Sequence, residues 1–220
     1  MKVLAIIPAR GGSKTIPRKN IKPLAGRPLI SYIIETAKKS QADRVVVSTD
    51  DSEIAGVAKK IGSEIIMRPE NLAQDSTPTL PVLQHAVRCL EREGYKPDVI
   101  LLLYPTAPLL KTERINQALA MLDGGYDSIL SVCEDNRNYK TWKKSGERWM
   151  PLFRQRVNRQ QKVQYRENGA IYAMNYDVLM KKNSMTGKKV GLLVMPEEES
   201  VDINTPLDFI LAETLMKMRK

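Results

Sequence analysis

The stretch VLAIIPARGGSK, residues 3–14, decides the fold of this 220-residue chain. Its first six residues form a continuous apolar run, which is typical of a strand buried on both faces of a parallel sheet. A glycine pair, Gly11 and Gly12, follows closely, and glycines allow the backbone to turn sharply. The stretch therefore predicts a buried parallel strand that leads into a glycine-rich loop at its carboxyl end.

The same pattern, a strand-like run after an amphipathic segment, repeats along the chain. Helical segments are expected at residues 28–40, 51–61, 79–93 and 112–122, and the strands that follow them begin at Arg44, Glu64, Asp98 and Ser128. The expected elements end with two more strand-like runs and a helix, at 164–173, 189–195 and 206–215. This alternation predicts an α/β fold with a mostly parallel sheet and helices on both faces.

Polar or turn-forming residues follow three of the predicted strands. They lie at residues 8–12, 48–51 and 104–108. In open parallel sheets, ligands bind outside the carboxyl ends of the strands. We therefore expect these three loops to converge on one site.

Positive charge is concentrated around the glycine pair. The formal net charge of the chain is +10, and no acid precedes Glu35, whereas Arg10, Lys14 and Lys19 surround the glycines. Backbone N–H groups in such a turn, together with these cations, can hold several phosphates. The Gly-Lys-Ser/Thr order of an ATPase P-loop and the G-x-G-x-x-G dinucleotide motif are both missing from the sequence, so neither an ATPase nor a dehydrogenase is favoured.

Length and composition predict one domain over residues 1–220. The 42% of hydrophobic and 27% of charged residues suit a single core. Alternation stops at about 134–163, a polar and basic segment with Trp142 and Trp149, where we expect an irregular insertion. No apolar stretch approaches the roughly 20 residues that span a bilayer, and the start lacks the shape of a cleaved signal. We expect a cytoplasmic protein without a membrane partner.

Eight short motifs, spread over nearly the whole chain, are similar to one known family. They are IPARGGSK (7–14), RKN (18–20), VSTD (47–50), RP (68–69), YPTAP (104–108), RQ (159–160), YRENGAIY (165–172) and VDINTPLD (201–208). In these motifs and their order the chain resembles the acylneuraminate cytidylyltransferases, the CMP-sialic acid synthetases and their bacterial relatives.

The resemblance implies a Rossmann-like core, a small projecting dimerisation segment and a homodimer. It also implies transfer of CMP from CTP, the co-substrate, to the anomeric hydroxyl of a sialic-acid-like nonulosonic acid, with Mg²⁺ and release of pyrophosphate. By position, the catalytic residues would be Arg10 and Lys19. The nucleotide would be bound by Gly12, Ser13, Lys14, Asn20, Arg68 and Thr79. The sugar would be bound by Tyr104, Arg159, Arg166, Asn168 and Tyr172, and the metal by Asp202 and Asn204.

Two alternatives stay open at this point. Tyr104, Ala107 and Leu110 stand where the family usually has Gln, Ser and Arg, in a loop that reaches toward the sugar, so CMP transfer to an octulosonic acid or a phosphonate is the first. The second is a nucleic-acid-binding protein that uses residues 137–166, with the tryptophans as stacking platforms. That function leaves the ordered motifs without a role, so we expect no nucleic-acid partner.

Overall fold

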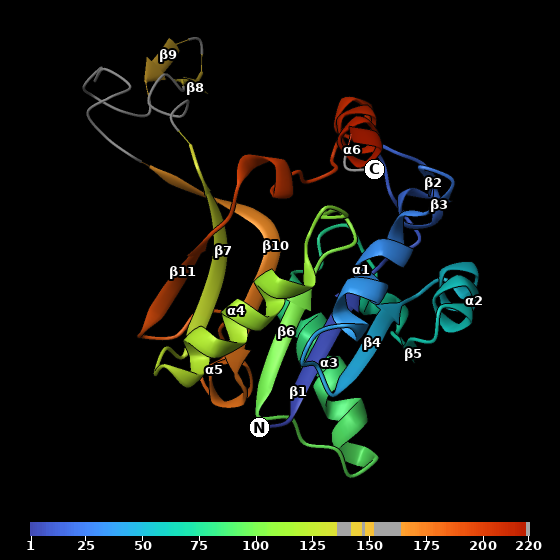
Figure 1. Ribbon diagram of the computed structural model, residues 1–220, viewed down its shortest axis with the longest axis vertical. Helices are drawn as coiled ribbons and strands as arrows, with labels where there is room; N and C mark the ends of the chain where they lie inside the picture. Colours follow the sequence, from blue (N-terminus) through green and yellow to red (C-terminus); the bar gives the residue numbers. More distant parts are fainter. Residues whose placement is uncertain (136–141, 147, 152–163, 219–220) are drawn as a thin grey trace.

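A computed structural model describes residues 1–135, 142–146, 148–151 and 164–218. Its main sheet has seven strands: β1 (Val3–Pro8), β4 (Arg44–Thr49), β5 (Glu64–Met67), β6 (Val99–Leu103), β7 (Ser128–Glu134), β10 (Tyr165–Asn175) and β11 (Val190–Val194). Their order is β11-β7-β10-β6-β1-β4-β5 (Figure 1). Only β10 runs antiparallel to its neighbours in this sheet. The expected mostly parallel α/β sheet is confirmed.

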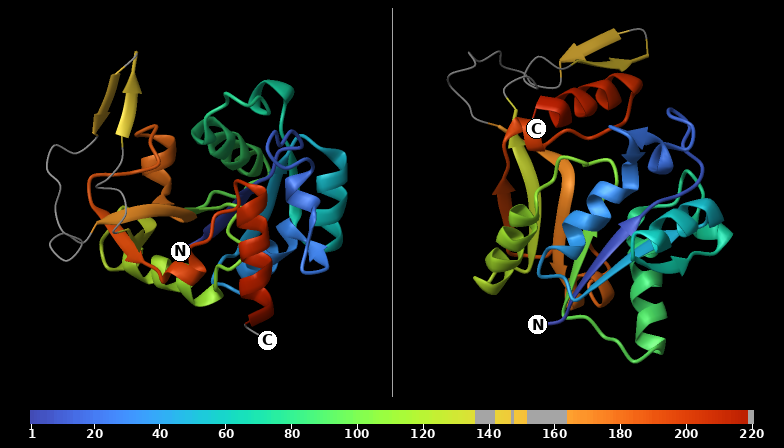
Figure 2. Two further views of the ribbon diagram at one scale, coloured as in Figure 1. Left: turned by 90° about the horizontal axis from the view of Figure 1, so that it is seen from above. Right: turned by 45° about the vertical axis from the view of Figure 1, so that its right-hand side comes forward.

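Helices cover both faces of this sheet (Figures 1 and 2). They are α1 (Leu29–Lys38), α2 (Ser52–Lys60), α3 (Thr79–Arg92), α4 (Thr112–Asp123), α5 (Tyr176–Met180) and α6 (Pro206–Met218). The helices α1, α2 and α4 share one core cluster with Ala5 and Ile7, whereas α3 and α5 share another with Leu4 and Ile6. Because successive strand side chains point to opposite faces, β1 has to be apolar throughout. No helix of the described residues is long and apolar enough to cross a bilayer.

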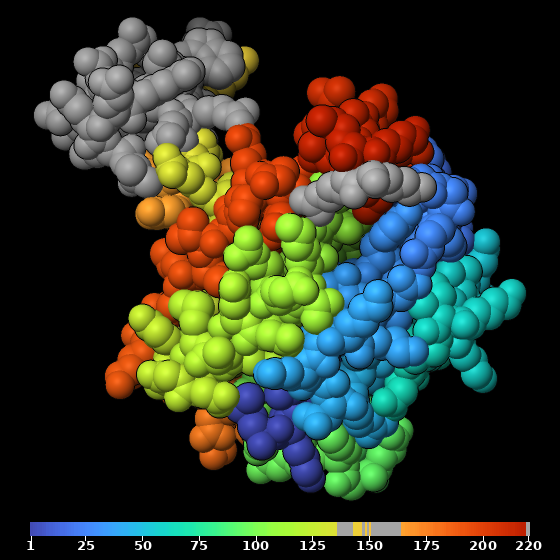
Figure 3. Space-filling model, in the orientation of Figure 1, coloured from blue at the N-terminus to red at the C-terminus, as the bar shows by residue number. Residues whose placement is uncertain are grey.

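The C-terminal helix α6 packs against the chain that links β1 to α1 (Figure 3). Ile16, Leu24 and Leu29 are buried there together with Ile203 and Ala212. The linking chain includes the short helix η1 (Lys19–Ile21) and a small pair of strands, β2 (Pro23–Leu24) and β3 (Arg27–Pro28). The C-terminal helix is thus held against the segment between β1 and α1.

The expected insertion at 134–163 is only partly described. Its described part is an antiparallel ribbon of β8 (Trp142–Ser145) and β9 (Arg148–Pro151), which is not part of the seven-stranded sheet. Figure 1 shows this ribbon beyond the end of β7. The segment therefore contains regular structure, which its irregular sequence pattern did not predict.

Truncation of the central strand tests the described core. Ile6 is fully buried, so Ile6→Ala should leave a cavity and lower the free energy of unfolding by about 2–5 kcal/mol. Leu207 is 72% exposed, and Leu207→Ala should change the free energy of unfolding by less than about 0.5 kcal/mol. Urea denaturation measures both values, and equal losses would contradict the central place of β1.

Candidate active site

The loops after β1 and β6 line one cavity, and the loop after β4 is bonded to the loop after β1. The N–H of Ala9 donates to the carbonyl of Ser48 at 2.9 Å, and the N–H of Gly11 donates to Asp50 at 3.3 Å. A cavity of about 260 Å³ opens beside these loops. Six of the predicted site residues line it: Arg10, Lys19, Asn20, Arg68, Thr79 and Tyr104.

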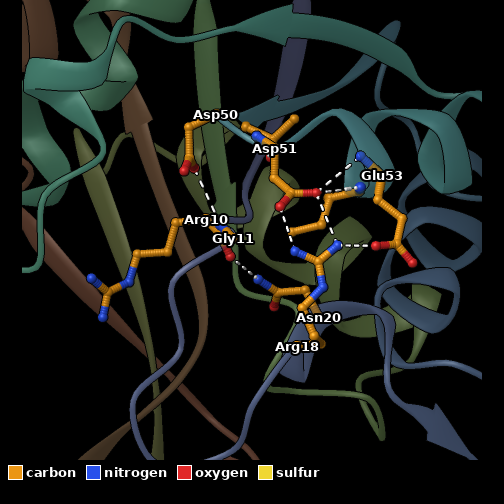
Figure 4. Close-up of polar contacts among 9 residues, drawn as sticks. Arg10, Gly11, Arg18, Asn20, Asp50, Asp51 and Glu53 are labelled. Atoms are coloured by element: carbon orange, nitrogen blue, oxygen red, sulfur yellow. Dashed lines mark hydrogen bonds and ion pairs between the residues drawn. The ribbon is translucent and has the colours of Figure 1, made fainter.

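The two glycines of the loop have different surroundings. A Cβ on Gly11 would lie 2.6 Å from a carboxylate oxygen of Asp51, whereas a Cβ on Gly12 would meet nothing within 4 Å. Asp51 is held in place because it caps α2 and pairs with Arg18 (Figure 4). Close packing against Asp51 therefore explains why residue 11 is a glycine. At Gly12 the space around the backbone is open, so a ligand can approach it. Ser13 is half-buried, and its N–H donates to the carbonyl of Gly11 at 3.2 Å.

The cations of the loop have acidic partners inside the protein. Arg10 and Lys14 both pair with Asp75, which lies before α3, and Arg18 pairs with Asp51 and Glu53. Hydrogen bonds from Lys14 and Arg10 hold the pKa of the Asp75 carboxyl below its ordinary value. Figure 4 shows the Arg10 side chain directed away from the Arg18 cluster. Because the pairs with Asp75 are solvent-exposed, they are weak enough for a phosphate to replace the carboxylate.

Lys19 connects the glycine loop to the C-terminal segment. Its Nζ donates to the carbonyl of Ile203 at 2.8 Å. Burial lowers the pKa of Lys19, while the negative charges of Asp202 and Asp208 act in the opposite direction. One half-buried ammonium group therefore lies between the first cavity and the predicted metal ligands.

Asn20 and Arg68 are both buried beside the first cavity, at 7% and 8% exposure. The amide of Asn20 donates to the carbonyl of Arg10 at 2.9 Å, so it holds the loop in shape. Arg68 donates to the carbonyl of Ser48 at 2.7 Å, but its Nε has no hydrogen-bond partner among the described residues. Burial lowers the pKa of Arg68. An unused donor of this kind is costly unless a ligand accepts from it.

Three hydroxyl side chains lead from the first cavity to β10. Thr79 and Tyr104 share a hydrogen bond of 2.8 Å between their hydroxyl groups. The ring of Tyr104 meets that of Tyr172 edge-on, with centroids 6.1 Å apart. The hydroxyl of Tyr172 donates to Glu167 at 2.9 Å. Burial, followed by the contact with Glu167, raises the pKa of Tyr172.

A second cavity, of about 520 Å³, brings Arg166 together with the predicted metal ligands Asp202 and Asn204. Arg166 pairs with Asp135 at 3.2 Å between Nε and a carboxylate oxygen. Sequence reasoning missed Asp135 and Asp208, which also line this cavity. Asp208 belongs to the motif VDINTPLD and was therefore within reach of the sequence, whereas nothing in the sequence links Asp135 to Arg166.

The predicted metal ligands have a donor set that fits a magnesium ion. One oxygen of Asp202 accepts from the amide of Asn204 at 2.6 Å, and its other oxygen has no hydrogen bond within the described chain. Asp208 accepts instead from the N–H groups of Asn204 and Thr205 at the start of α6. Mg²⁺ in nucleotide enzymes is usually held by one or two carboxylates together with substrate phosphates. Asp202, with Asn204 beside it, can provide that protein share.

Two predicted sugar-binding residues, Asn168 and Tyr172, line neither of these two cavities. Asn168 is 1% exposed, and its amide accepts from Ser131 at 2.6 Å and donates to Ser200 at 2.9 Å. These bonds join β7, β10 and the segment before Asp202. Arg159 lies outside the described residues.

Comparison with known proteins identifies the family. A family model described as cytidylyltransferase matches residues 4–189. The chain is 32% identical to the CMP-N,N'-diacetyllegionaminic acid synthase of Legionella pneumophila, over 100% of this chain and 98% of that protein. It is 30% identical to the N-acylneuraminate cytidylyltransferase of Escherichia coli, over 99% of this chain but only 53% of that protein. The chain thus spans about half the length of the second relative.

The solved structures support the same core. CMP:2-keto-3-deoxy-manno-octonic acid synthetase, complexed with CTP, matches over 100% of both chains with a TM-score of 0.74 and 18% identity. At this identity the likeness shows the fold alone, which is the expected Rossmann-like α/β core. Because the family model covers most of the sequence and the Legionella relative is matched over nearly its whole length, the chain belongs to the cytidylyltransferase family and is a nucleotidyltransferase.

Proposed function

We propose that this protein transfers CMP from CTP to the anomeric hydroxyl of a sialic-acid-like nonulosonic acid and releases pyrophosphate. The observation that carries the proposal is the placement of Lys19 between the cation-lined first cavity and the second cavity, which holds Arg166 and Asp202. The two relatives, a CMP-N,N'-diacetyllegionaminic acid synthase and an N-acylneuraminate cytidylyltransferase, support this substrate class.

The first cavity and its loop would bind the nucleotide. Arg10, Lys14 and Lys19 neutralise the triphosphate, which makes the α-phosphorus more electrophilic. The open backbone at Gly12, with Ser13 beside it, donates to its oxygens. Asp75 has to release Arg10 and Lys14 as the phosphates arrive. The attacking hydroxyl belongs to the sugar, so no protein nucleophile is needed. Asp202 and Asn204 would hold Mg²⁺, which supplies further neutralisation of the phosphates.

The base and the sugar would lie on either side of Tyr104. Arg68 and Thr79 provide donors for the cytosine side, and the planar guanidinium of Arg166 suits the sugar carboxylate, with Tyr172 nearby. Asn20 and Asn168 act as positioning residues, because their amides bind the protein itself. The proposed contact between Arg159 and the sugar rests only on the motif RQ (159–160).

Assembly and location complete the proposal. We place the reaction in the cytoplasm and infer a homodimer of single-domain chains, each covering residues 1–220. The segment 134–163 would form the projecting dimerisation part. The described ribbon of β8 and β9, which lies apart from the main sheet, is compatible with that role.

A substrate panel tests the proposed reaction. The purified protein with CTP, Mg²⁺ and a nonulosonic acid should release pyrophosphate, and UTP should react far more slowly, by up to about 10⁴-fold, because it leaves base-binding groups unpaired. Octulosonic acids and phosphonates serve as the comparison acceptors. Faster turnover of either would reassign the acceptor, and equal rates with UTP would exclude a cytidine-specific pocket.

The glycine loop gives a paired test. Gly12→Ala should keep the thermal unfolding midpoint, because nothing surrounds the new methyl group, but raise the KM for CTP by about tenfold or more by displacing the phosphates. Gly11→Ala should instead lower the midpoint, because its Cβ meets Asp51. An unchanged KM for Gly12→Ala would argue against a phosphate at this position.

The metal ligands give a second mutational test. Asp202→Asn should abolish most activity, by about 10²–10³-fold, with little change in thermal stability, because the magnesium ion loses its charged ligand. Asn204→Asp should keep activity and make it depend more strictly on the magnesium ion, since the substitution adds a charged oxygen. The exposed Asp177→Asn on α5 is the control and should leave the magnesium dependence unchanged. Full activity of Asp202→Asn at low Mg²⁺ would place the metal elsewhere.

A further inference from the structure

Glu199 is the least exposed of the described carboxylates, at 2%. It ends the short helix η5 (Glu197–Glu199), which follows β11. One of its oxygens lies 2.6 Å from the Nζ of Lys111, and the other lies 2.7 Å from the Nε of Arg114. Both cations belong to the start of α4, so the buried carboxylate joins the C-terminal part of the chain to that helix.

Glu199 lines neither of the two cavities of the proposed active site. A buried carboxylate is costly unless it is paired, and here both of its oxygens have a cationic partner. Its position, three residues before Asp202, indicates what this pairing fixes. Glu199 does not touch a ligand site, but the residues that follow it do.

The segment from Ser200 to Asn204 has no ladder of backbone hydrogen bonds to hold it. It is fixed instead at single points. Ser200 accepts from Asn168 at 2.9 Å and donates to the carbonyl of Pro196 at 2.7 Å, and the N–H of Ile203 donates to Thr106 at 2.9 Å. Asp202 lies between these points and, among the described residues, bonds only to Asn204. Its position therefore depends on the anchors at either side. Lys19 holds the carbonyl of Ile203 after it, and the ion pairs of Glu199 hold the segment before it.

We propose that Glu199 is a positioning residue for the metal site: by binding Lys111 and Arg114 it fixes the segment that carries Asp202, and so sets the affinity for Mg²⁺. The proposal rests on the assignment of Asp202 as metal ligand under the proposed function. Partners that orient metal ligands typically contribute about 10- to 100-fold to metal affinity or activity.

The test is the substitution Glu199→Gln, which keeps the size of the side chain and removes its charge. Free Mg²⁺ is titrated at saturating CTP, with two readouts: the rate of pyrophosphate release and the rise of the thermal unfolding midpoint. The half-saturating Mg²⁺ concentration should rise by about 10- to 100-fold in both readouts, with the rate restored at high Mg²⁺. Glu64→Gln, which breaks an exposed ion pair with Arg44 on the far edge of the sheet, is the control and should leave the titration unchanged.

A purely structural role predicts a different result. If Glu199→Gln lowers the unfolding midpoint but leaves the half-saturating Mg²⁺ concentration unchanged, the proposal is overturned. If that variant does not fold, Arg114→Met, which keeps the pair with Lys111, takes its place, and an unchanged titration overturns the proposal in the same way. The variant Asp202→Asn separates the positioning role of Glu199 from the assignment of Asp202 as metal ligand. Loss of the Mg²⁺ response there, with a normal response in Glu199→Gln, removes only the positioning role, whereas a normal response in Asp202→Asn also removes the metal assignment.

Discussion

The burial of β1 on both faces is the constraint on which the rest of the structure depends. Because β4 pairs with one of its edges and β6 with the other, β1 lies in the interior of the sheet, with core clusters on both sides. The chain that leaves Pro8 must then emerge between the ends of these two neighbours. The glycine loop is thereby brought against Asp50 and Asp51 after β4 and beside Tyr104 after β6. One apolar strand thus decides where the cavity forms.

Charge in this region is arranged in two classes. Arg18 pairs with Asp51, and Asp51 also caps α2. The charge of Arg18 therefore stabilises the fold itself. Arg10 and Lys14 share one exposed carboxylate, Asp75, and such exposed pairs contribute little to stability because water and salt screen them. A ligand with several negative charges competes readily with Asp75 for Arg10 and Lys14. The positive charge around the loop is therefore only partly available to a ligand. Arg10 and Lys14 can exchange Asp75 for a ligand, whereas Arg18 stays bound to Asp51.

The sequence predicted the fold well, because its evidence is local. Periodicity and the position of the glycine pair depend on neighbouring residues, and the strands and helices follow them closely. The antiparallel direction of β10 was not predicted, because an apolar run carries no information about strand direction. Six residues that were predicted for the site line one cavity, and five of them belong to the motifs. The carboxylates Asp75, Asp135 and Glu199 were missed, because their ion pairs form between residues far apart in the sequence. For Asn168 the structure shows an amide bonded within the protein, and a motif cannot tell such an amide from one that binds a ligand.

The wall of the first cavity at Tyr104, with Tyr172 packed against it, bears on how an acceptor is selected. The hydroxyl of Tyr104 already has Thr79 as a partner, and that of Tyr172 has Glu167, so the two rings meet edge-on with their polar groups engaged inside the protein. A wall of this kind selects mainly by shape, and shape alone discriminates by about 1–3 kcal/mol for one methylene group. A site with unused donors discriminates much more strongly, because a wrong ligand leaves them unpaired. Arg68 lines the first cavity, and its buried Nε has no partner among the described residues. Under the proposed function, a base that accepted a hydrogen bond from this atom would be selected more strictly than an acidic sugar.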